Sequence, residues 1–143
     1  MFDLTKEVPR LDLCQQLKRL GFPQETGGFY WRKFKDGWKV DYIPYISVVK
    51  RMVRQGVIIK APTSVELDKY LPCFIYKGKD KYFKQYDTPD DTQNLLSYVN
   101  SDTGKCLITL ADVYKPNLDA KMLVYLITRR YINLKELSDD NSD

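Results

Sequence analysis

The sequence predicts an α+β fold, in which a mostly antiparallel sheet built from hairpins is covered by two or three helices. Segments with strand-like alternation are interrupted by glycine-containing turns, and segments with helical spacing of apolar residues lie between them. Helices interleaved with hairpins do not follow the regular β-α-β order of a parallel sheet. With 143 residues, 43% of them hydrophobic, the chain can bury a core. We expect one domain over residues 1–137 and a disordered acidic tail over 138–143.

Two hairpins are predicted from their turns. Asp36-Gly37 joins Phe29–Lys35 to Trp38–Ile43, and Asp-Gly suits a type I′ turn because both central residues need positive φ. Aromatic residues occupy both faces of the first arm, so we expect one face to pack on the core and the other to be partly open. Gly78-Lys79-Asp80 joins Cys73–Lys77 to Lys81–Tyr86 in the second hairpin.

Four helices are predicted from apolar spacing and from their ends. Leu11–Leu20 ends at Gly21, and Ile46–Gln55 ends at Gly56 and should turn Ile46, Val49, Met52 and Val53 inward. Thr63-Ser64-Val65-Glu66 fits a capping box and opens a short helix that ends at Leu71. Asn117 is the expected N-cap of the last helix. Its apolar stripe is expected in the core: Leu118, Met122, Leu123, Leu126 and Ile127.

The segment between the second hairpin and the last helix is the least determined by its pattern. Val57–Ile59, before it, is a short buried strand or a sheet edge. Within 87–116, Leu95–Val99 fits a strand or a helix, and Lys105–Leu110 is expected to be a strand.

The residue inventory predicts no catalytic residues, no metal site and no cofactor. The chain has no histidine, which excludes Ser-His-Asp or Cys-His nucleophile activation and histidine-ligated zinc. Cys14, Cys73 and Cys106 form no C-x-x-C pair, so we expect three small buried hydrophobic residues, with a reactive thiol as the alternative. Lys77–Lys81 lacks the spacing of a phosphate-binding loop.

One group of acidic residues leaves a catalytic alternative open. Paired carboxylates can ligate Mg²⁺ or divide acid and base roles between them. The same residue types are common in turns and N-caps, which is the interpretation we favour. The group consists of Asp87, Asp90, Asp91 and Asp102.

The termini and the apolar runs predict a cytoplasmic protein without a membrane segment. No basic segment followed by an apolar one opens the chain, so a signal peptide is not expected. The longest nearly apolar run, Met122–Thr128, is much shorter than the roughly 20 residues of a membrane-spanning helix.

Three short segments carry a resemblance. They are Gly21-Phe22-Pro23-Gln24, Ala61-Pro62-Thr63-Ser64 leading through Glu66-Leu67 to Leu71-Pro72, and Asp119-Ala120-Lys121-Met122-Leu123. In this order the chain resembles a group of small uncharacterised proteins of bacterial prophages and mobile elements. The resemblance implies a phage-derived or accessory role and supplies no activity.

The charge distribution is the feature with functional content. Residues 1–86 hold 17 Lys and Arg against 9 Asp and Glu, a net charge of +8, and residues 87–143 hold 6 against 10, a net charge of −4. Aromatic residues interleave with the cations of the two hairpins, a combination that nucleic-acid binders use for phosphates and bases. The expected site residues are Arg32, Lys33, Lys35, Trp38, Lys39, Lys77, Lys79, Lys81 and Tyr82.

Two functions are compatible with this surface. A non-catalytic accessory or protein-interaction domain is the leading hypothesis, because Trp, Tyr and Arg are enriched at interface hot spots and a long edge strand would permit self-association. Nucleic-acid binding through a basic, aromatic hairpin face is the alternative. We therefore expect a protein partner or a second copy, with nucleic acid as the other candidate.

Overall fold

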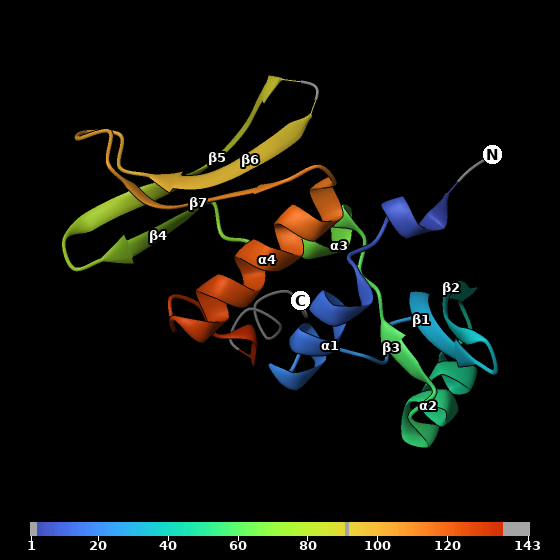
Figure 1. Cartoon of the computed structure of the whole chain (residues 1–143). Coiled ribbons are helices and arrows are strands. Elements are labelled where there is room, and N and C mark those ends of the chain that lie inside the picture. The colour runs from blue at the N-terminus through green and yellow to red at the C-terminus, as the bar shows by residue number, and fades with distance from the viewer. Residues whose placement is uncertain (1–2, 91, 136–143) are drawn as a thin grey trace.

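The computed structural model describes residues 3–90 and 92–135, which form helices and two sheets (Figure 1). In chain order the elements are η1 (Leu4–Lys6), α1 (Leu11–Arg19), β1 (Gly28–Phe34), β2 (Gly37–Ile43), α2 (Ile46–Gln55), β3 (Ile58–Lys60), α3 (Ser64–Asp68), β4 (Phe74–Lys77), β5 (Asp80–Asp90), β6 (Gln93–Val99), β7 (Cys106–Asp112) and α4 (Lys115–Thr128). The expected acidic tail, 138–143, lies outside the described residues.

The α+β class and the antiparallel pairing are confirmed, and the strands divide into two sheets. The small sheet has the order β2-β1-β3 and the large sheet the order β4-β5-β6-β7, with every pairing antiparallel. The undetermined segment 87–116 supplies the end of β5, then β6 and β7. Leu95–Val99 is therefore strand, and the large sheet is a meander of consecutive strands.

The elements stack in layers with α4 near the middle (Figure 1). The large sheet lies on one side of α4, and α1 packs on another side. Helix α1 also contacts β3 of the small sheet, and α2 packs against β2 and β3. The β4–β5 turn and the β1–β2 hairpin lie at opposite ends of this stack.

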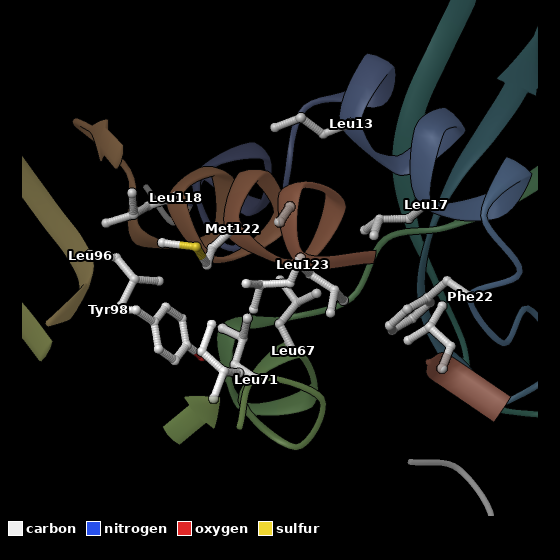
Figure 2. Close-up of a cluster of buried hydrophobic side chains, with 14 of the residues drawn as sticks. Leu13, Leu17, Phe22, Leu67, Leu71, Leu96, Tyr98, Leu118, Met122 and Leu123 are labelled. Atoms are coloured by element: carbon white, nitrogen blue, oxygen red, sulfur yellow. The ribbon is translucent and has the colours of Figure 1, made fainter. Parts of the chain in front are cut away.

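The main core lies between the large sheet and the helices. Leu118, Met122 and Leu123 of α4 are fully buried, as are Leu96 and Tyr98 of β6 (Figure 2). The same cluster includes Leu13 and Leu17 of α1, and also Phe22, Leu67 and Leu71, of which Leu67 and Leu71 lie near Tyr98. The predicted apolar stripe of the last helix is thus in the core, with Ile127 partly buried at its margin.

The start of α4 differs from the prediction. The helix begins at Lys115, with Tyr114 as N-cap and a proline in its first turn, so Asn117 is not the N-cap. The Asn117 side chain is buried and its Oδ1 accepts a hydrogen bond from the backbone N–H of Arg10 at 2.8 Å. Its oxygen therefore serves a group far away in the sequence instead of the helix end.

The charge on Asp119 is also used for tertiary structure. Its carboxylate is fully buried, accepts the Tyr86 hydroxyl at 2.8 Å and pairs with the Lys115 ammonium at 2.8 Å. A buried carboxylate with two such partners is satisfied. This contact ties α4 to β5.

One face of the first hairpin packs on the core and the other is partly open, as expected, since its residues are only partly buried and Tyr42 is 58% exposed. Tyr30 and Ile43 pack with Val49 and Met52 of α2. On the other face, four side chains pack against a cluster that contains Val8 and Cys14. They are Phe29, Trp31, Trp38 and Val40. The prediction that Ile46 points inward was wrong, since its side chain is exposed at the start of α2.

The turn of the first hairpin is not of the predicted type I′. Among the described non-glycine residues only Arg130 has positive φ, whereas Gly37 has φ 121°. Lys35 and Asp36, the two loop residues, therefore lack the positive φ that a type I′ turn requires, so the turn is not of that type. In the second hairpin the first loop residue, Gly78, has φ 63°, as a type II′ turn requires.

Two of the three cysteines depart from the expectation. Cys14 is buried, but Cys73 and Cys106 are exposed. Cys106 begins the outermost strand β7, and Cys73 precedes the outermost strand β4. The expectation of three buried hydrophobic residues was correct only for Cys14.

The predicted capping box is present and holds a buried lysine. The Thr63 hydroxyl accepts from the Glu66 N–H at 3.3 Å, and Glu66 accepts from the Thr63 N–H at 3.2 Å. The helix α3 ends at Asp68, earlier than predicted. The second oxygen of Glu66 pairs at 2.9 Å with Lys60, whose side chain is fully buried.

Replacing Glu66 by alanine is expected to destabilise the protein strongly. Losing one partner of a buried ion pair costs about 3–5 kcal/mol, and the lower end applies because Glu66 is one-third exposed. Urea unfolding measures the change, with the exposed Glu25→Ala as the matched control within about 0.5 kcal/mol. Adding Lys60→Met to Glu66→Ala should recover part of the lost free energy of unfolding, because no unpaired charge then remains buried. A loss in the double variant equal to the sum of the losses of the two single variants would contradict the pairing.

Alkaline pH is expected to lower the free energy of unfolding. Burial raises the pKa of the Cys14 thiol to about 12, while an unfolded thiol titrates near 8.5. Above about pH 9 the unfolded chain loses this proton and the folded chain keeps it, so stability falls by at most about 1.4 kcal/mol per pH unit. Urea unfolding between pH 7 and 10 should show this slope, and Cys14→Ala should remove it. An unchanged slope in Cys14→Ala would contradict this assignment. Two tyrosines, Tyr86 and Tyr98, also have pKa values raised by desolvation of their hydroxyl groups, but they add to the slope only above about pH 10.

Candidate nucleic-acid interface

The four-stranded sheet has an inner face toward α4 and an outer face that none of the described elements covers (Figure 1). Residues directly opposite each other in an antiparallel pair lie on the same face, and faces alternate along each strand. Leu96 and Tyr98 are buried, which fixes the inner face. One row of the outer face is therefore Phe74, Phe83, Val99 and Cys106, which are register partners in turn across all four strands.

Three aromatic rings gather on the outer face near the β4–β5 turn. Phe74 is 41% exposed, Phe83 40% and Tyr76 58%. The Phe74 and Tyr76 rings have centroids 5.6 Å apart, and those of Phe74 and Phe83 are 6.2 Å apart. We call Phe74, Tyr76, Phe83 and Lys81 the aromatic platform.

Lys81 sits among the three rings. Tyr76 is its register partner, and its ammonium lies 4.0 Å from the Phe74 ring centroid, 5.0 Å from that of Phe83 and 5.7 Å from that of Tyr76. Such cation–π contacts contribute about 0.5–1 kcal/mol each at exposed sites. The lysine thus shelters the exposed rings and remains charged.

The hairpin that carries the platform is basic. Lys77 ends β4 and Lys79 lies in the turn, with Asp80 as the one carboxylate between them and Lys81. No ion pair within the described residues joins Lys77, Lys79 or Lys81 to a carboxylate. An anionic ligand would therefore meet cations whose charge is not neutralised.

Tyr82 does not belong to this surface. It is a register partner of Ile75, and both are buried on the inner face. Lys84, two residues further along the same face, donates to Asp68 at 2.8 Å. The predicted site residue Tyr82 is therefore in the core and presents no ring to a ligand.

The two predicted groups of site residues do not form one face. The five residues of the first hairpin belong to the small sheet, at the opposite end of the molecule from the β4–β5 turn (Figure 1). Arg32 pairs with Asp41 at 3.0 Å and Lys39 with Asp36 at 2.8 Å. Trp38 is half-buried against the cluster of Val8 and Cys14; Lys33 and Lys35 are exposed.

The platform residues that the prediction missed carry a readable signal. Alternation from the turn places Tyr76 and Phe74 with Lys81 and Phe83 on one face, and Ile75 with Tyr82 on the other. The choice of face, however, depends on which face α4 covers. That contact joins segments distant in the sequence, so the local pattern does not contain it.

The acidic group does not converge within the described residues. Asp87 lies opposite Leu95 near the start of β6, whereas Asp102 follows Asn100, beyond the other end of that strand. The Asp90 side chain and Asp91 lie outside what the structure describes. In the described chain no three His, Cys, Asp or Glu residues are placed to hold a metal ion, and no helix has the length and apolar character of a membrane span.

Comparison of the chain with family models, with curated proteins and with solved structures gives no match. The resemblance to prophage and mobile-element proteins therefore stays a prediction, and the function is argued from the site alone.

Thiol chemistry reports on the accessibility of the outer face. In the folded protein, 5,5′-dithiobis(2-nitrobenzoic acid) is expected to react rapidly with two thiols, Cys73 and Cys106, because both are exposed. Cys14 should react only after denaturation, since its thiol is buried and its pKa is raised to about 12. Cys106→Ser and Cys73→Ser each remove one fast thiol. Slow reaction of Cys106 in the monomer would show that the outer face is covered.

Proposed function

We propose that the protein binds single-stranded nucleic acid on the outer face of the large sheet. The observation that carries the proposal is the aromatic platform, in which three partly exposed rings surround an unpaired lysine. Bases stack on aromatic side chains irrespective of sequence, at about 1–3 kcal/mol per base, and lysines neutralise the phosphates.

Lys81 can make one contact in the free protein and a different one in the bound protein. In the free protein the Lys81 ammonium lies over the rings, which reduces the exposure of apolar surface. When bases stack on the rings, the same ammonium turns to a phosphate, and Lys79 of the adjacent turn supplies a second cation. One cation then replaces a cation–π contact by a charge-assisted contact with an anion.

Charge favours nucleic acid over a second copy on this face. Two copies that met through the platform would bring Lys79 and Lys81 of both chains to a common interface, where like charges repel. A polyanion instead releases counterions on binding. Within a duplex the bases are paired and stacked on one another, so single strands suit a stacking surface better than duplexes.

Fluorescence anisotropy of a labelled ten-nucleotide oligo(dT) and of a matched duplex tests the proposal. The single strand should bind more tightly, and with the two lysines Lys79 and Lys81 at phosphates the slope of log K against log salt should be about −1.4. Tyr76→Ala and Phe83→Ala should each weaken binding by about 5- to 150-fold. These exposed positions should leave circular dichroism and the urea midpoint nearly unchanged.

A charge-reversal pair supplies the matched control. Lys79→Glu should strongly weaken oligonucleotide binding, whereas Lys35→Glu, an exposed lysine in the turn of the other hairpin, should change it little. No binding by the wild type at low salt would overturn the proposal and leave the platform as a protein-binding surface. Equal effects of both reversals would show nonspecific attraction without the platform.

A further inference from the structure

A cavity lies at the other end of the molecule from the aromatic platform, where β2 leads into α2. Its volume is about 560 Å³, within the range of small-molecule sites, about 300–1,000 Å³. Its walls come from β1, the end of β2 and the helix α2, and it is separate from the outer face of the large sheet. The proposed function does not use it.

Two guanidinium groups line this cavity. Arg32 reaches it from β1 and Arg51 from α2. Arg32 donates to Asp41 through one nitrogen, Nη1, at 3.0 Å, and the other oxygen of Asp41 accepts the Tyr42 N–H at 2.9 Å. Arg51 is exposed and has no ion pair within the described residues. The cavity thus holds two positive charges against one negative charge, and guanidinium groups bind phosphate in a bidentate way.

Two tyrosines complete the cavity. Tyr45 is 72% exposed and Tyr42 58% exposed, and both line it. On its inner side lie Ile43 and Met52, which are buried. Exposed rings beside an apolar floor suit a flat aromatic group, and Tyr is a good stacking partner for a base.

We propose that this cavity binds a phosphorylated nucleoside, with the phosphate at Arg51 and Arg32 and the base against Tyr45 or Tyr42. The same chemistry is present in a free mononucleotide and in the 5′-terminal nucleotide of a strand. This proposal is independent of the aromatic platform, because none of the platform residues lines the cavity.

Isothermal titration calorimetry with 5′-AMP tests the proposal, with adenosine and inorganic phosphate as partial ligands. AMP should bind at least 10-fold more tightly than either partial ligand. Arg51→Gln should weaken AMP binding by about 10- to 100-fold, in line with a charge-assisted contact, and Tyr45→Ala should weaken it by 5-fold or more. Lys50→Gln, one residue away on the exposed side of the same helix, should leave it unchanged.

Absence of AMP binding at millimolar concentration would overturn the proposal, as would equal binding of adenosine and AMP or equal losses in Arg51→Gln and Lys50→Gln. If a 5′-phosphate increases the affinity for an oligonucleotide, and Arg51→Gln removes this increase, the ligand of the cavity is the 5′ end of a strand. If AMP binds but the 5′-phosphate does not increase the affinity for an oligonucleotide, the ligand is a free nucleotide. Tyr76→Ala should weaken oligo(dT) binding and leave AMP binding intact. The two proposals can thus fail separately.

Discussion

The burial of α4 is the constraint on which the rest of the structure depends. Leu118, Ala120, Met122, Leu123 and Leu126 are all fully buried, because the large sheet and α1 pack on different sides of this helix. A helix buried on several sides must also satisfy its polar groups. Asn117 does so with the backbone of Arg10, and Asp119 with Tyr86 and Lys115.

This arrangement determines which face of the large sheet is free. The helices α3 and α4 pack on the inner face, whereas α1 packs on α4 and β3, and α2 packs on β2 and β3 of the small sheet. A meander of four strands leaves no crossover helix to lie on its other side. The aromatic platform is exposed for this topological reason, since residues of the same type on the inner face, such as Tyr82 and Tyr98, are core.

Local sequence signals predicted most elements correctly, and the errors have a common cause. The helix α2, the capping box and both hairpins could be read because their determinants lie within a few residues. Asn117 was misassigned because its partner, Arg10, is 107 positions away, while the proline of the first turn of α4 was a usable local signal. The exposure of Cys73 and Cys106 depends on which strands end up outermost.

The candidate site was predictable only in part for the same reason. Lys77, Lys79 and Lys81 were identified from charge, and the alternation of the hairpin separates Tyr82 from Tyr76 and Phe83. No local pattern shows that the two basic hairpins join different sheets, because that depends on β1 pairing with β3 and β5 with β6. One expected face therefore became two separate surfaces.

The outermost strands of both sheets are protected against pairing with another chain, whereas the aromatic platform is left exposed. Three of the four outermost strands have a backbone group occupied by a side chain: Gln24 accepts the Lys60 N–H on β3, Asp41 accepts the Tyr42 N–H on β2, and Lys121 donates to the Ala111 carbonyl on β7. The fourth, β4, has four residues. Such devices limit pairing with another chain and argue against self-association through an edge strand. The edges of the sheets are thus protected against pairing, whereas Phe74, Tyr76 and Phe83 remain exposed around one lysine on the open face. We infer from this contrast that the aromatic platform is a binding surface. Because the lysine already shelters the rings, that surface is compatible with a free protein in water and with an anionic, ring-bearing ligand.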